Sequence, residues 1–312
     1  MEDFWRIEEG KVISTTIDKY IYVIIKERFD DLIVLNYSRR ETVQNVSKIK
    51  HELIRESLVK TGITGGVEIT TLADIPSEGS GLGSSSSVTV GLLNAFYTYK
   101  GVQVTAERLA REACEIEIEI LGKPIGKQDQ YAAAYGGLNE IIFHADGTVA
   151  LEEISLSPRS RLNFGSSILM FYTNITRSSC SVLSEQKTRT PQNFDTLRKM
   201  RNQAGNVKMI LQSGKRFKVL GEILDEAWVL KRQLASNISN SQIDQMYQSA
   251  LEAGATGGKI SGAGGGGFLM LYVPREEQNS VREALKDYRE LPFMLDPCGT
   301  RIMLNIVRNY WS

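Results

Sequence analysis

The sequence predicts a two-domain α+β protein on three observations. Its 312 residues are enough for two domains that each bury a core. Runs rich in β-branched residues mark the first part of the chain, whereas residues 190–254 carry helical patterns over a length unlike that of a doubly wound sheet. A polar segment at residues 155–161 separates these parts. We therefore expect an N-terminal domain at residues 1–160 and a C-terminal domain at residues 161–312.

The first half of the chain is expected to begin with two long strands. Residues 11–26 are dense in β-branched and aromatic side chains, which predicts one strand. A second strand is expected at residues 31–37, joined to the first by a hairpin turn at residues 28–31. The further elements expected here are a helix at 50–60 ended by Gly62, a strand at 67–72, helices at 84–99 and from Thr105 to about Leu121, and strands at 138–143 and 149–152.

The second half is expected to be a strand, a group of helices and two more strands. Its helical stretch is interrupted by turn residues at Ser213-Gly214 and Ser236-Asn237. The other elements expected are a strand at 167–172, a glycine-rich loop at 257–267 that leads into a strand at 268–273, a helix at 276–288 and a final strand at 300–307.

Composition excludes several classes of function. Lysine plus arginine equals aspartate plus glutamate at 37 each, so no bulk charge favours nucleic acid or an anionic membrane as a partner. No apolar run is long enough to span a bilayer. Cys114, Cys180 and Cys298 are far apart and form no CxxC pair, which favours the reducing cytoplasm. With only His51 and His144 present, a histidine-rich metal centre is excluded.

The run from Pro76 to Ser87 carries the strongest functional signal. It places three glycines and four consecutive serines between a predicted strand and a predicted helix. The N–H groups at the start of a helix lack partners within the helix, and its dipole adds positive potential there. Glycine lets a phosphate approach the backbone closely. The run therefore favours a phosphate site over a plain turn with a serine cap.

Two further segments strengthen this interpretation. Asp129 lies where the loop after Gly126 turns into a short alanine-rich helix, a place that can hold a carboxylate firmly. The run from Lys259 to Gly267 is a second glycine-rich loop, ahead of a predicted strand.

Common nucleotide-binding and hydrolase motifs do not fit. No lysine follows the first glycines at the spacing of a Walker A motif. Ser84 stands where a dinucleotide fingerprint needs its third glycine, which argues against a dehydrogenase. A GxSxG nucleophile elbow is also absent.

The motifs that are present resemble those of the GHMP kinases. The run from Pro76 to Ser87 is similar to the PxxxGLGSSxx loop of that family, and the run from Lys259 to Gly267 is similar to its KxxGAGGGG motif. Segments 14–20, 126–134 and 171–178 resemble the branch of sugar kinases that includes D-glycero-D-manno-heptose 7-phosphate kinase. The resemblance implies a ribosomal S5 domain 2-like N-terminal domain and a ferredoxin-like C-terminal domain.

The resemblance also implies ATP and Mg²⁺ as cofactors. Ser85 and Glu117 are the implied Mg²⁺ ligands, with Ser84, Ser86 and Glu119 as alternatives to them. The implied ATP-binding residues are Glu78, Gly79, Ser80, Gly81, Leu82, Gly83, Ser84, Ser85 and Ser86.

A sugar or sugar phosphate is the implied substrate. Asp129 is the implied catalytic group, which accepts or orients the proton of the sugar hydroxyl, with Lys127 as an electrostatic partner. Arg177, Gly264 and Gly265 are implied to complete the substrate site together with Asp129. Other interpretations remain open: a helix cap for Asp129, a solvated side chain for Lys127 and for Arg177, and a plain tight loop for the second glycine run.

One departure from the family affects the expected function. Family members usually begin with a basic strand and a GGGTD-like segment that contacts the sugar, and Met1–Arg6 aligns with residues just beyond it. We therefore expect that segment to be missing from this sequence. The expected function is an ATP-dependent kinase that acts on the anomeric hydroxyl of D-glycero-D-manno-heptose 7-phosphate. The alternatives are a kinase of the galactose or fucose type, and a catalytically silent homologue that binds ATP or a sugar phosphate.

Overall fold

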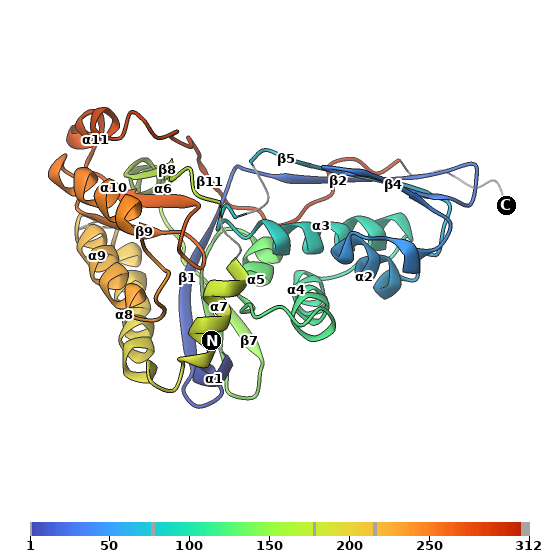
Figure 1. Cartoon of the computed structure of the whole chain (residues 1–312), viewed down its shortest axis with the longest axis horizontal. Coiled ribbons are helices and arrows are strands. Elements are labelled where there is room, and N and C mark those ends of the chain that lie inside the picture. Colours follow the sequence, from blue (N-terminus) through green and yellow to red (C-terminus); the bar gives the residue numbers. More distant parts are fainter. Residues whose placement is uncertain (1, 76–78, 177–178, 215–216, 307–312) are drawn as a thin grey trace.

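The computed structural model describes residues 2–75, 79–176, 179–214 and 217–306. Within these residues the strands pair into three sheets, which lie with their helices in two bodies that meet at the centre of the molecule (Figure 1). This arrangement confirms the predicted two-domain α+β fold. The division between residues 160 and 161 stays a prediction.

The first sheet forms the far end of one body (Figure 1). Its strands in spatial order are β2 (Ile21–Glu27), β5 (Val67–Ala73), β3 (Ile33–Asn36) and β4 (Arg40–Val43). The short helix η1 (Val46–Lys48) precedes two covering helices, α2 (Glu52–Thr61) and α3 (Ser84–Tyr99). Leu58 of α2 and Phe96 of α3 pack against Ile33 and Ile69 of the sheet, so an apolar core holds both helices on it.

Two strand predictions in this region are wrong. The expected single strand at 11–26 is two strands, because β1 (Gly10–Ile17) and β2 belong to different sheets. Asp18 and Tyr20 fix the break: the Asp18 carboxylate accepts from the Met294 backbone N–H at 2.8 Å, and the Tyr20 N–H donates to Asp74 at 2.9 Å. The expected hairpin at 28–31 is also wrong, since β2 pairs antiparallel with β5 while β3 pairs parallel with its other edge.

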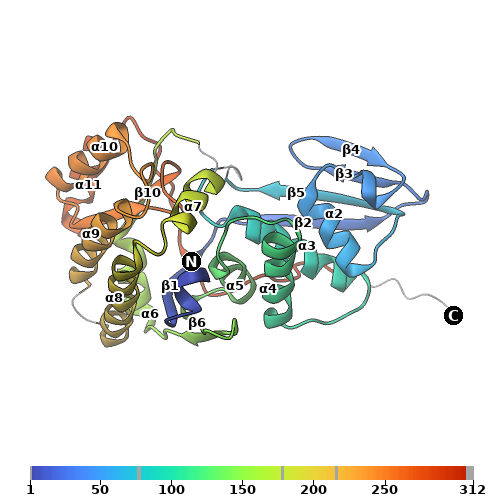
Figure 2. The same ribbon diagram turned by 60° about the horizontal axis from the view of Figure 1, so that its bottom comes forward.

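The second sheet links the two bodies. Its strands in spatial order are β11 (Leu295–Asp296), β1, β6 (Leu138–Phe143) and β7 (Val149–Glu153). Beside it lie α1 (Glu2–Trp5), α4 (Ala106–Cys114), a π-helical turn (Glu115–Ile120) and α5 (Gln128–Tyr135). The helix from Thr105 is capped as predicted, but it changes into the π-helical turn before Leu121. Helices α3, α4 and α5 lie side by side (Figures 1 and 2) and share one apolar core.

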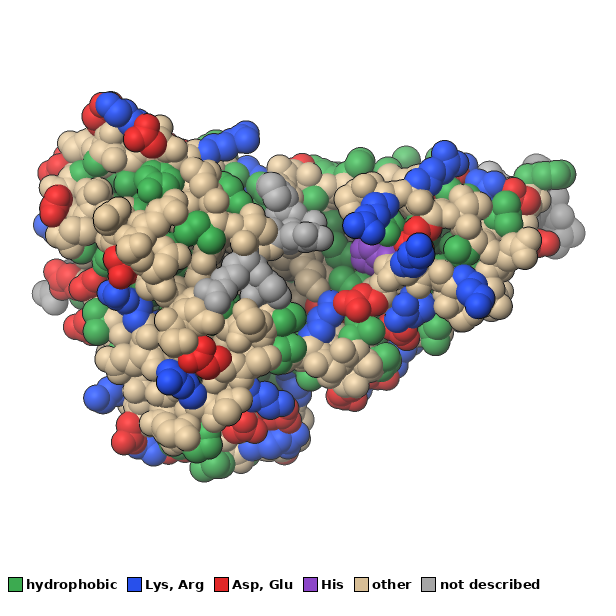
Figure 3. Space-filling view, viewed as in Figure 1, with side chains coloured by type: hydrophobic (Ala, Val, Ile, Leu, Met, Phe, Trp, Pro, Cys, Tyr) green, Lys and Arg blue, Asp and Glu red, His purple; other side chains and the backbone are tan. Residues whose placement is uncertain are grey.

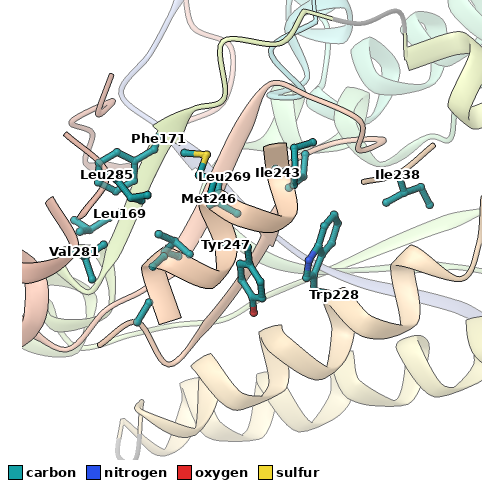
Figure 4. Close-up of a cluster of buried hydrophobic side chains, with 14 of the residues drawn as sticks. Leu169, Phe171, Trp228, Ile238, Ile243, Met246, Tyr247, Leu269, Val281 and Leu285 are labelled. Carbon is teal, nitrogen blue, oxygen red and sulfur yellow. The ribbon is translucent and has the colours of Figure 1, made fainter. Parts of the chain in front are cut away.

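The third sheet and most of the remaining helices form the other body. The antiparallel sheet has the order β8 (Ile168–Tyr172), β10 (Phe268–Tyr272) and β9 (Gly257–Ile260). The helices here are α6 (Pro158–Ser166), α7 (Ser179–Thr188), α8 (Phe194–Ser213), α9 (Val219–Arg232), α10 (Ser241–Glu252), η3 (Arg275–Glu277) and α11 (Gln278–Ala284). Figure 4 shows Trp228 of α9 and Tyr247 of α10 in the core between these helices and the sheet. The helix expected at 276–288 is shorter than predicted.

The chain beyond β11 returns along the first body instead of forming the predicted final strand at 300–307. Over residues 300–306 this prediction is wrong, and Val307 lies outside the described residues. A groove of about 1170 Å³ separates this segment from β2, and Met303 and Leu304 are exposed along it.

Two further features concern the charge of the surface and the length of the helices. Basic and acidic side chains are interspersed over the face in Figure 3. No helix within the described ranges has the length and apolar character needed to cross a membrane.

Candidate active site

The first glycine loop ends at the N-terminus of α3. Gly79, Gly81 and Gly83 have φ of +70°, +71° and +72°, a left-handed conformation that residues with a β-carbon rarely adopt. Gly83 is the N-cap residue of α3 and offers no side-chain oxygen to the first turn. The N–H groups of that turn are therefore available to an anion, and the helix dipole favours negative charge there.

Asp129 lies beside this helix start. It occupies the first turn of α5, whose N-cap residue is Lys127, so the interpretation of Asp129 as a helix cap is wrong. A β-carbon added to Gly83 would lie 3.4 Å from Asp129 Cγ, which places the carboxyl group against the loop. Burial raises the pKa of Asp129, the Glu117 charge raises it further, and a hydrogen bond from Gln128 opposes them.

Ser85 and Glu117 meet directly. The Ser85 hydroxyl donates to Glu117 Oε2 at 2.6 Å, joining the first turn of α3 to the π-helical turn. Glu117 is fully buried, whereas Glu119 is exposed, so the structure brings only Glu117 to Ser85. The side chain of Gln130 is also buried here and donates to Glu117 Oε1 at 3.1 Å.

These side chains fit a magnesium ion. Gln130 Oε1 is buried without a hydrogen-bond partner, while the Nε2 atom of the same side chain donates to Glu117. Ser85 Oγ and the Glu117 carboxylate, which are in direct contact, are oxygen donors of the kind that Mg²⁺ prefers, and Gln130 offers a further oxygen beside them. The prediction from sequence missed Gln130. The signal that could have found it is its place directly after Asp129, in the same short helix.

The second glycine loop packs onto the first. A β-carbon on Gly262 would lie 2.6 Å from Gly81 Cα, and one on Gly267 would lie 2.5 Å from the Ser80 carbonyl oxygen. Because only hydrogen atoms fit at these contacts, the loops can touch through their backbones. The two glycine runs are therefore one assembly.

Other predicted site residues lie elsewhere. Gly264 and Gly265 contact Ile238: the Gly265 N–H donates to the Ile238 carbonyl at 2.7 Å, and a β-carbon on Gly264 would lie 2.8 Å from the Ile238 side chain. The Lys127 ammonium donates to the Gly147 carbonyl at 2.9 Å and lies over the Trp5 ring, turned away from Asp129. Glu78 and Arg177 lie outside the described residues.

Comparison with known families identifies two matching models. The model described as "GHMP kinases N terminal domain" matches residues 34–137, and the one described as "GHMP kinases C terminal" matches residues 192–290. The first range contains the first glycine loop, Glu117 and Asp129, and the second contains the second glycine loop.

Individual proteins are similar over most of the chain. The D-glycero-alpha-D-manno-heptose 7-phosphate kinase of Campylobacter jejuni is 29% identical over 293 residues, covering 89% of this chain and 86% of that protein. The galactokinase of Pyrococcus furiosus is 27% identical over 325 residues, covering 89% and 88%. The crystal structure of a D-glycero-D-manno-heptose 1-phosphate kinase from Bacteroides thetaiotaomicron superposes with a TM-score of 0.77 at 27% identity, covering 94% and 90%.

Proposed function

Because the chain belongs to the GHMP kinase family, we propose that it transfers the γ-phosphoryl group of ATP to the anomeric hydroxyl of D-glycero-D-manno-heptose 7-phosphate. Its enzyme class follows from the family: it is a phosphotransferase that acts on a hydroxyl group. One observation supports the chemistry above all others, namely that the Asp129 carboxyl group lies against the glycine loop at the start of α3.

The heptose phosphate is proposed from the relatives. Both a curated protein at 29% identity and a solved structure at 27% identity carry the name of a heptose-phosphate kinase. The similarity to galactokinase supports a sugar as the wider substrate class. We place the reaction in the cytoplasm, because the three cysteines form no disulfide and unpaired thiols are typical of a reducing compartment.

The phosphate end of the site is built from backbone. The N–H groups of the first loop and of the first turn of α3 bind the ATP phosphates, and the second loop closes on them from the other body. Ser85 and Glu117, with Gln130 beside them, would hold Mg²⁺, and the contact of Ser85 with Glu117 supports this; the ion would neutralise charge on the phosphate oxygens.

Asp129 acts at the reacting hydroxyl. The sugar oxygen bonds to the γ-phosphorus while the bond from that phosphorus to the β,γ-bridging oxygen breaks, so ADP leaves. The proton of the hydroxyl passes to the Asp129 carboxylate. The raised pKa of this carboxyl makes it a stronger base than an exposed aspartate.

A substrate panel tests the proposal. The protein is incubated with Mg²⁺ and ATP and with heptose 7-phosphate, unphosphorylated heptose, galactose, fucose or mevalonate, and ADP release is followed. We expect turnover with heptose 7-phosphate and a product whose new phosphorus couples to the anomeric proton by NMR. Turnover of galactose or fucose alone would replace this substrate with the alternative one.

The role of Asp129 is tested separately. Asp129→Asn is expected to lower the rate about 10²–10⁴-fold, because it removes the proton acceptor, while ATP affinity stays within several-fold. Asp195→Asn is the matched control, since Asp195 is 86% exposed on α8. ATP binding without turnover of any sugar, unchanged in Asp129→Asn, would identify a silent homologue instead.

A further inference from the structure

A buried lysine lies behind the second glycine loop. Lys231 belongs to the last turn of α9 and is only 9% exposed. Its ammonium donates to the Ile260 carbonyl at 2.9 Å and to the Gly262 carbonyl at 2.6 Å. Lysine is almost never this buried without a paired group, because its charge loses hydration. The two carbonyl bonds are therefore its compensation.

Gly262, which accepts one of these bonds, also contacts the first glycine loop. Gly262 lies against Gly81, where an added β-carbon would come within 2.6 Å of the Gly81 Cα. A shift of the Gly262 carbonyl is therefore transmitted directly to the first loop. Lys231 is therefore linked to the contact between the two loops through Gly262 alone.

The rest of the second loop is held in a different way. Backbone bonds anchor its later part, from the Gly265 N–H to Ile238 and from the Gly267 N–H to Ile175 at 3.0 Å. The side chain of Gln186 donates to the Ala263 carbonyl at 3.3 Å. In the first turn of the loop the Ser261 N–H donates to the Phe268 carbonyl at 2.9 Å, and the carbonyls of Gly262 and Ala263 accept from side chains. Lys231 makes the shortest of these side-chain bonds.

We propose that Lys231 is a positioning residue for phosphoryl transfer, which fixes the second glycine loop against the loop that binds the ATP phosphates. This inference rests on the proposed function. A lysine that only filled the core could be replaced by methionine, which has a similar length and no charge to bury. The carbonyl bonds are what methionine would lose.

Loss of the Lys231 proton does not remove the two hydrogen bonds. Burial, and then repulsion from Lys259 of β9, lower the pKa of Lys231 to about 7. A neutral amine still carries two N–H donors, one for each carbonyl. Lys231 can therefore hold the loop in either charge state.

The test uses the full chain with three variants. Lys231→Met removes both bonds, and Lys231→Gln keeps N–H donors on a shorter, uncharged side chain. Lys208→Met is the matched control, because Lys208 pairs with Glu140 and Glu152 on another part of the fold. Hydrogen exchange of the amides in residues 257–268 reports on the loop without any ligand, and calorimetry with Mg²⁺ and ATP reports on nucleotide affinity.

We expect Lys231→Met to speed exchange in this segment about 10-fold or more and to weaken ATP binding by a similar factor, since hydrogen bonds to a charged group are of that strength. Lys231→Gln should fall between this variant and the wild type, and Lys208→Met should leave both readouts unchanged. With heptose 7-phosphate, kcat should fall more than the KM for the sugar rises.

The following outcomes would reject the positioning role of Lys231. Unchanged exchange in both Lys231 variants would overturn it, as would a change equal to that of Lys208→Met. If neither Lys231 variant folds, Lys231 is a core residue and the positioning role is rejected. Failure of the proposed function is separate, since it appears as a wild-type protein that turns over no sugar in the panel.

Discussion

Gly81→Ala probes the contact between the two glycine loops, and the chain supplies a matched control for it. Gly81 and Gly101 have nearly the same φ, +71° and +72°. Alanine in this left-handed conformation costs about 1–2 kcal/mol at either position. Gly101 lies in an exposed turn with nothing within 4 Å of an added β-carbon, so Gly101→Ala measures the backbone cost alone.

The two variants differ in what the new methyl group meets. At Gly81 the added β-carbon would lie 2.7 Å from the Ser261 carbonyl oxygen, whereas ordinary contacts begin near 3.4 Å. The loops must therefore separate by about 0.7 Å. An error near 1 Å in the placement of reacting groups costs about 10²-fold in rate. We expect kcat/KM for ATP to fall about 10-fold or more in Gly81→Ala and to stay unchanged in Gly101→Ala.

Thermal unfolding and steady-state kinetics together decide the matter. Both variants should lose a few degrees in melting temperature from the shared backbone cost, and Gly81→Ala should lose more because the loops must also separate. Only Gly81→Ala should lose activity. Equal kinetics in the two variants would show that the contact between the loops does not position the phosphates, and the reasoning would be refuted.

Three further predictions concern the metal, the base and the buried lysine. Ser85→Ala should raise the Mg²⁺ concentration for half-maximal rate about 10-fold or more, whereas Ser85→Thr, which keeps the hydroxyl, should stay near the wild type. In the metal-free protein, carboxyl NMR should show Asp129 titrating above the ordinary value of about 3.9, and Glu117→Gln should lower that pKa because it removes a negative charge. As the pH rises from about 7 to 10.5, the free energy of unfolding of the wild type should increase relative to that of Lys231→Met. The reason is that Lys231 has lost its proton in the folded protein but keeps it in the unfolded chain. Urea unfolding at pH 6.5 and pH 9.5 measures this difference.

Elements with local end signals could be predicted from the sequence. Helix α3 spans Ser84–Tyr99 as expected, because glycine precedes it and its apolar positions recur at helical spacing and pack into two neighbouring cores. Helix α2 ends at Gly62, whose φ of +69° is the conformation that a glycine cap supplies. Such signals act within a few residues, so no tertiary information is needed to read them.

Pairing partners could not be predicted in the same way. Residues 11–26 have strand-forming side chains throughout, with no glycine or proline at the break after Ile17. The break exists because Asp18 is held by Met294, a partner more than 270 residues away. The parallel pairing of β3 with β5 likewise depends on a contact that no local pattern specifies.

Some residues of the candidate site could be predicted from sequence, and others depend on tertiary structure. Ser85, Glu117 and Asp129 lie together, as proposed from motifs whose spacing reflects their chemistry. The alternation from Glu115 to Ile120 could not separate Glu117 from Glu119, because a π-helical turn decides which one is buried. Lys231 has the sequence context of an ordinary helix lysine, and only its tertiary position reveals its partners.

The pairing of β1 with β11 has a consequence for synthesis on the ribosome. Thr16 donates its hydroxyl to the Asp296 carbonyl, and the two residues are 280 positions apart. At about 5–20 residues per second, β1 waits roughly 15–55 s for this neighbour to emerge. During that time the edge of β1 at Thr16 and Ile17, the two residues that pair with β11, is open to other chains. The nascent protein is therefore expected to need protection at this edge, and a chaperone that binds extended segments would provide it.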